Sequence, residues 1–118
     1  NNMLFWIFIL ILILTSASSL GIFLSRKNKS IKNFTGKNQT ILFLAILSIF
    51  VFALDLQRGG DVAHALGYVV GYVYIFTLPC SFLAVFLMNK FKINSKEIWS
   101  SWFFSLILVS IIFIKQSF

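Results

Sequence analysis

Acidic side chains are scarce in this sequence. Of its 118 residues only three are Asp or Glu, against ten Lys or Arg and a single His. Asp55, Asp61 and Glu97 all stand at the ends of apolar stretches rather than inside them. Cation-coupled transporters keep a carboxylate within the membrane to bind the coupling ion, so a carrier of that kind is not expected. The sequence also lacks paired carboxylates for acid–base catalysis, and we predict that the protein is not an enzyme.

Cysteine and proline are scarce as well. Cys80 is the only cysteine, which excludes an intrachain disulfide and a multi-cysteine metal site. Nucleotide-binding, metalloprotease and hydrolase motifs are absent, so we expect no cofactor and no metal. The only proline, Pro79, lies inside an apolar stretch. It should kink a helix there and free a carbonyl near Ile75, which Thr77 or a neighbouring helix could satisfy.

Charge is low overall, at 11% of residues, whereas 59% are hydrophobic and the mean hydropathy is +0.95. A soluble domain has about 25% charged and about 45–50% apolar residues. A chain this short has too little interior to hide such an excess of apolar side chains. Disorder is excluded too, because it requires low hydrophobicity and high charge. The composition therefore predicts an integral membrane protein.

Four apolar stretches approach or exceed the length of a helical membrane span, which is about 20 residues. They cover about residues 4–24, 40–56, 62–88 and 98–114. Lipid offers the backbone no hydrogen-bond partners and four spans are too few for a closed barrel, so each stretch must be a helix. We predict an all-α, four-helix transmembrane bundle that forms one domain over 1–118, with basic loops at 25–39 and 89–97.

The basic residues indicate how the bundle is oriented. Eight lie in the two loops and two on the other side: Arg26, Lys27, Lys29, Lys32, Lys37, Lys90, Lys92 and Lys96, against Arg58 and Lys115. The positive-inside rule then places both basic loops in the cytoplasm and both termini outside, in a plasma membrane that we expect to be bacterial. Loop anchoring and attraction to the lipid bilayer account for the net charge of +7, so no nucleic-acid partner is expected. Trp6, Trp99 and Trp102 fit interfacial anchors.

The first apolar stretch has a competing interpretation. Residues 4–14, followed by the small residues 15–19, are similar to the apolar core and cleavage region of a signal peptide. No basic residue precedes them, and cleavage would leave the first basic loop outside, so we interpret the stretch as a span. Three glycosylation sequons, at Asn28, Asn33 and Asn38, lie in that same loop and are interpreted as chance matches.

The third stretch concentrates the chemically varied residues. A wheel at about 100° per residue separates two faces. One face carries His64, Gly67, Tyr68, Gly71, Tyr72 and Tyr74, and the other carries Val62, Leu66, Val69, Val73 and Phe76. Ala63, Gly67 and Gly71 are spaced four apart, a pattern that lets membrane helices approach closely. We predict that they pack helices, mainly within the chain, against Ala17 and Gly21 or against Ser101 and Ser105, and otherwise against a partner.

Residues around the start of this stretch form a candidate contact site. Arg58 opens a tight Gly-Gly turn, and Asp61 is placed to cap the next helix. His64, with Asp61, Tyr68, Tyr72 and Arg58, could contact a ligand or a partner. We favour a structural role for His64, a hydrogen bond to Asp61 or Tyr68, because a lone histidine makes no metal site.

Three functions fit these observations. We favour a non-enzymatic membrane protein that associates helix to helix, as an accessory, assembly or regulatory subunit of a larger membrane complex, or with itself. The first alternative is an oligomeric small transporter or channel with an outward-facing site formed by Asp61, His64, Tyr68 and Tyr72. The second is a toxin-immunity or lysis-control membrane protein, a class with which the sequence shares only size and hydropathy. A lipid-modifying enzyme built on His64 and Asp61 is disfavoured, because no nucleophile is evident beside them.

Overall fold

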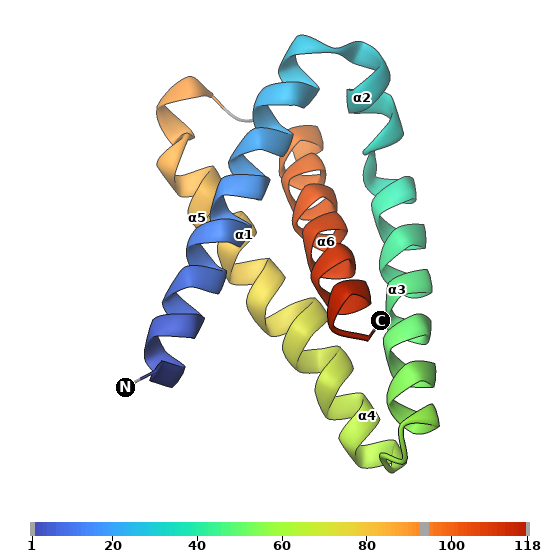
Figure 1. Ribbon diagram of the computed structural model, residues 1–118. Helices are drawn as coiled ribbons and strands as arrows, with labels where there is room; N and C mark the ends of the chain where they lie inside the picture. Colours follow the sequence, from blue (N-terminus) through green and yellow to red (C-terminus); the bar gives the residue numbers. More distant parts are fainter. Residues whose placement is uncertain (1, 93–94, 118) are drawn as a thin grey trace.

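The computed structural model describes residues 2–92 and 95–117, and its regular elements over these residues are all helices (Figure 1). They are α1 (Asn2–Lys27), α2 (Lys29–Phe34), α3 (Lys37–Gln57), α4 (Val62–Tyr68), the π-helix η1 (Val69–Phe76), α5 (Thr77–Leu87), the short 3-10 helix η2 (Asn89–Phe91) and α6 (Ser95–Ser117). Four helical segments are long and apolar enough to cross a membrane: Asn2–Lys27, Lys37–Gln57, Val62–Leu87 and Ser95–Lys115. The predicted all-α four-helix bundle is confirmed.

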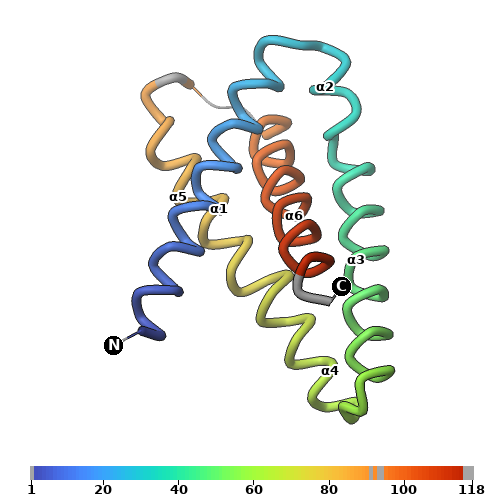
Figure 2. Tube along the Cα trace, in the orientation of Figure 1, coloured from blue at the N-terminus to red at the C-terminus, as the bar shows by residue number. Residues whose placement is uncertain are grey.

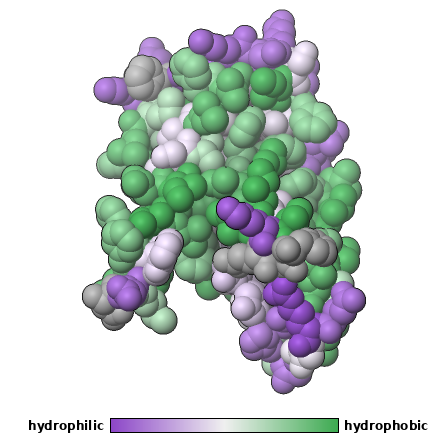
Figure 3. All heavy atoms as spheres, in the orientation of Figure 1, coloured by the Kyte–Doolittle hydropathy of each residue, from purple (hydrophilic) through white to green (hydrophobic). Residues whose placement is uncertain are grey.

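The third of these segments is one continuous helical segment built from three elements: α4, η1 and α5. Figure 2 shows α4, η1 and α5 following one another along a single diagonal path. The neighbouring segments run up and down beside it, so that the connection through α2 and the connection between α5 and α6 lie at one end of the bundle. The turn between α3 and α4 lies at the other end. Hydrophilic surface gathers at both ends and hydrophobic surface between them, which fits insertion into a membrane (Figure 3).

The first basic connection is more ordered than the loop expected at 25–39. It contains α2, for which Asn28 is the N-cap: the Asn28 side chain accepts a hydrogen bond of 2.9 Å from the Ser30 N–H. Such a cap satisfies a backbone donor that the first turn of a helix leaves unpaired. The hydroxyl of Thr35, at the end of α2, lies 2.6 Å from that of Ser100 in α6. This contact therefore attaches the connection to α6.

The apolar core has two parts, both of which include α6. The larger lies between α3, η1 and α6, and the smaller between α1, α5 and α6. The buried members are Leu47, Val51, Val69, Val73, Leu106 and Phe113 in the larger part and Leu14, Cys80 and Val109 in the smaller. The β-branched side of η1 thus faces the core. This leaves the side with the glycines facing outward.

Small residues bring α1 and α6 together. Gly21 is buried, and a Cβ added to it would lie 2.7 Å from the Phe104 ring and 2.9 Å from the Ser100 carbonyl oxygen. The hydroxyls of Ser18 and Ser105 hydrogen-bond across the same contact. Close approach and hydroxyl pairing are typical ways in which membrane helices associate. Two of the small residues expected as partners for the third span, Gly21 and Ser105, therefore take part in the contact between α1 and α6, and the Ser105 hydroxyl also lies 3.5 Å from that of Ser81 in α5.

The π-helix changes the geometry of the third span. Hydrogen bonds in a π-helix run from residue i to i+5, so its turns are wider than those of an α-helix. It ends three residues before Pro79, which has no N–H to donate to a preceding carbonyl. The Thr77 hydroxyl donates to the Val73 carbonyl, rather than to Ile75 as expected. A wheel drawn at about 100° per residue consequently misplaces residues toward the end of η1, although it assigns Val69 and Val73 correctly to the core side.

Candidate functional site

The turn between α3 and α4 needs both of its glycines. Gly59 has a φ of +98°, in the left-handed region that glycine adopts without strain. Gly60 lies against Asp55: its N–H donates to the Asp55 carbonyl over 3.1 Å, and an added Cβ would collide with the Asp55 carboxylate. Arg58 is exposed within the turn, and its backbone N–H donates to the Leu54 carbonyl over 3.1 Å. The chain therefore reverses over three residues.

Asp61 ends the turn and begins α4. Its side chain accepts a hydrogen bond of 2.7 Å from the His64 N–H, which confirms the expected N-cap. The carboxylate is thereby committed to the helix terminus, although the residue remains exposed.

The partner of the His64 ring is Asp55. Nδ1 of His64 lies 2.8 Å from Oδ2 of Asp55, in the last turn of α3, and Asp55 is only 9% exposed. The sequence predicts a hydrogen bond from the His64 ring to Asp61 or Tyr68. In the structure, Nδ1 of the ring bonds to Asp55 instead. Asp55 was missed because it precedes the turn, whereas the residues expected around His64 all lie within the turn or after it. In the described part of the chain, no three His, Cys, Asp or Glu side chains are grouped so that they could hold a metal ion.

An aromatic row continues from His64 along α4 and η1, one ring every four residues. The His64 and Tyr68 rings meet edge to face at 5.1 Å, and Tyr68 and Tyr72 stack at 5.3 Å with 10° between their planes. Tyr72 and Phe76 follow at 6.3 Å. Aromatic pairs at these separations attract each other beyond the effect of burial alone. We call these four side chains the aromatic row.

The aromatic row corrects two assignments from the helical wheel. Phe76, expected on the face opposite His64, lies on the same side, and Tyr74, expected beside His64, packs against the larger core. Both differences fall in η1, where the wider π turn shifts each successive side chain away from its α position. A spacing of four from His64 through Tyr68 and Tyr72 to Phe76 is visible in the sequence and would have indicated the row.

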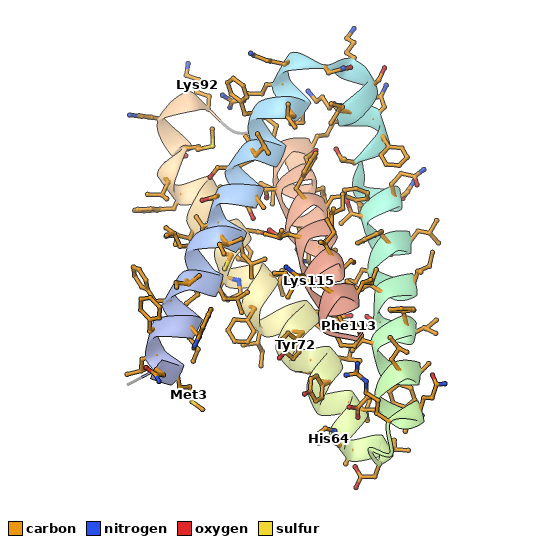
Figure 4. The ribbon with its side chains drawn as sticks, viewed as in Figure 1. Met3, His64, Tyr72, Lys92, Phe113 and Lys115 are labelled. Atoms are coloured by element: carbon orange, nitrogen blue, oxygen red, sulfur yellow. The ribbon has the colours of Figure 1, made fainter. Side chains whose placement is uncertain are left out.

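Gly67 and Gly71 form the floor of a groove beside the row. The groove has a volume of about 370 Å³ and is lined by His64, Gly67, Tyr68, Gly71, Tyr72 and Phe76. No atom outside the local helix lies within 4 Å of a Cβ added to either glycine, and Ala63, one turn earlier, is exposed. Figure 4 shows His64 and Tyr72 along this part of the span. The expectation that these small residues pack mainly within the chain is therefore wrong, because the bulkier valines take the core side.

The structure thus brings together three of the five candidate contact residues. His64, Tyr68 and Tyr72 line the groove, whereas Asp61 and Arg58 lie in the turn beyond it. Comparison with family models, curated proteins and solved structures yields no match. The groove offers glycine backbone and the partly exposed side chains of the aromatic row, surfaces that suit contact with another helix.

Proposed function

We propose that this chain is a non-catalytic membrane protein that binds a transmembrane helix of another membrane protein, as an accessory or assembly subunit of a larger complex. The contact surface is the groove formed by Gly67, Gly71 and the aromatic row. We place the protein in a bacterial plasma membrane, with the end that carries the basic connections in the cytoplasm. The clustering of eight basic residues in those connections supports this orientation.

The observation that carries the proposal is the open space above Gly67 and Gly71. Apolar side chains alone do not drive helices together in lipid, because the lipid tails are equally apolar. Close backbone approach provides the missing attraction, through dispersion contacts that larger residues prevent. Gly21 already serves this purpose inside the bundle, where Phe104 and Ser100 lie against it. Gly67 and Gly71 have the same side-chain size and remain uncovered, so a second helix can approach them.

The aromatic row gives the groove one rigid wall. Tyr68 and Tyr72 are half-buried, and each packs in part against the core. Rings held in this way lose little conformational freedom when a partner binds, which lowers the entropic cost of association. A partner helix lying along the groove would therefore meet a preformed surface.

The test compares three variants of the full chain in mild detergent. Gly67→Leu and Gly71→Leu each fill the groove and should abolish copurification with the partner. Ala45→Leu is the control, because Ala45 is an exposed small residue of α3 outside the groove. Self-association is measured in parallel by energy transfer between two labelled populations of the chain. Equal copurification and equal energy transfer in all three variants would refute the groove as the contact surface.

A further inference from the structure

A second apolar groove lies between α5 and α6, near the end of the bundle with the basic connections. Its volume is about 160 Å³, and its walls are formed by Leu78, Ser81, Phe82, Ile98, Trp99 and Trp102. Phe82 is 63% exposed, so the groove opens on the hydrophobic outer surface of the bundle. The proposed helix contact on α4 and η1 uses none of these residues.

Two tryptophans shape the end of this groove. Their ring centroids are 5.7 Å apart, and the Trp102 indole N–H donates to the Thr77 hydroxyl over 3.0 Å, which fixes its ring between α6 and α5. Tryptophan is enriched at the depth of the lipid headgroups, because its ring is apolar and its N–H is polar. The Trp102 N–H is satisfied inside the bundle, so it is Trp99, nearer the start of α6, that marks the end of the groove toward the headgroup level.

Two exposed lysines lie at the same end of the bundle as the tryptophans. Lys96 is exposed and precedes Trp99 by three residues in α6, so both side chains lie on one face of that helix. Lys92 follows α5 in the connection and is exposed, and Figure 4 places it at this end of the molecule. A lipid in the groove would thus have cations at its headgroup.

The acidic residue nearest in sequence to these lysines, Glu97, is turned inward. Glu97 is 4% exposed, and its carboxylate pairs with the Arg26 guanidinium at 2.9 Å. The same guanidinium donates to the Lys92 carbonyl over 2.9 Å, tying α1 to the connection. Glu97 is thereby held inward, whereas Lys92 and Lys96 are exposed.

We propose that the groove between α5 and α6 binds one acyl chain of an anionic phospholipid, with the lipid phosphate held by Lys96 and Lys92. Apolar walls below and cations above match the two parts of such a lipid. An acidic protein segment would match only the cations and would leave the groove between Phe82 and Trp102 empty. This site is independent of the function proposed above.

The test measures quenching of tryptophan fluorescence by lipids with brominated acyl chains. The full chain carrying Trp6→Phe retains Trp99 and Trp102 as its reporters. It is reconstituted into vesicles of brominated phosphatidylglycerol mixed with phosphatidylcholine, and into the reverse mixture in which phosphatidylcholine is brominated. We expect stronger quenching by the anionic lipid, and Lys96→Gln should lower this preference about fivefold, the effect of one cation near a lipid surface.

Two further variants test whether the lipid preference arises at this groove. Lys29→Gln removes an exposed lysine from α2, at the same end but in the other connection, and should leave the preference unchanged. Phe82→Ala removes an exposed wall of the groove and should weaken quenching by both lipids without changing their ratio. The proposal is overturned if the unaltered groove shows no preference, if Lys29→Gln matches Lys96→Gln, or if Phe82→Ala has no effect.

Discussion

Gly21→Ala and Gly67→Ala are the same chemical change at two glycines with opposite surroundings. At Gly21 the new Cβ would lie 2.7 Å from Cδ2 of Phe104 and 2.9 Å from the Ser100 carbonyl oxygen. The ring can turn aside in part, but the carbonyl belongs to the backbone of α6, so α1 and α6 must move apart. At Gly67 the same atom enters open space.

The two effects have different magnitudes and opposite signs. Overpacking costs about 1–3 kcal/mol, and the contact with backbone at Gly21 favours the upper part of this range. Exchange of Gly for Ala in a helix contributes about 1 kcal/mol in the other direction at both sites. Gly21→Ala should therefore lower the free energy of unfolding by about 2 kcal/mol, and Gly67→Ala should raise it by up to about 1 kcal/mol.

The assay is reversible unfolding in mixed micelles, with helix content followed by circular dichroism as the fraction of denaturing detergent rises. The helix content before unfolding shows whether each variant folds at all. A Gly21→Ala variant as stable as the original chain would refute the close contact between α1 and α6. A loss of stability in Gly67→Ala would refute the open face of α4, and with it the surface proposed for the partner.

Two further predictions concern the ends of the bundle. Arg26→Gln removes the ion pair of the buried Glu97 carboxylate and should lower the free energy of unfolding by about 3 kcal/mol in the same assay. Lys29→Gln, the control, should leave the free energy of unfolding almost unchanged. Equal losses in the two variants would contradict a structural role for the ion pair. His64→Ala takes the imidazole from the Asp55 carboxylate, so the amides of residues 58–61 should exchange with solvent faster while those of α6 do not change. Unaltered exchange in the turn would show that this contact does not hold α3 and α4 together.

The number of spans could be predicted from sequence because hydropathy responds to length and composition alone. The Asp61 cap was predictable for a similar reason, since a cap depends on residues within one turn. The partner of His64 could not be predicted in this way. Asp55 contacts the imidazole only because the Gly59-Gly60 turn brings α4 back beside the end of α3. Contacts of that kind depend on chain direction after the turn, which periodicity does not report.

The third span shows a second limit of sequence patterns. A pair of small residues at a spacing of four indicates that close approach is possible but not which helix approaches. Gly21 is covered by Phe104, and Gly67 is not covered, although both belong to such patterns. The difference arises from competition for the core: Val69 and Val73 bury more apolar surface than glycine can, so they take the inward positions.

The π-helix has a consequence for how this span can change. Because each of its turns takes up more residues than an α turn, η1 sets the rotational phase between α4 and α5. Removal of one residue within 69–76 would restore α-helical winding and leave the two halves in the same relative rotation, because the shorter α segment turns the chain about as far as the longer π segment. Removal of one residue from α5 has no such compensation: it would turn either the aromatic row or Cys80 and Ala84 away from their present directions. The π-helix thus lets this span hold an additional residue while its outward aromatic row and its inward core residues stay in register.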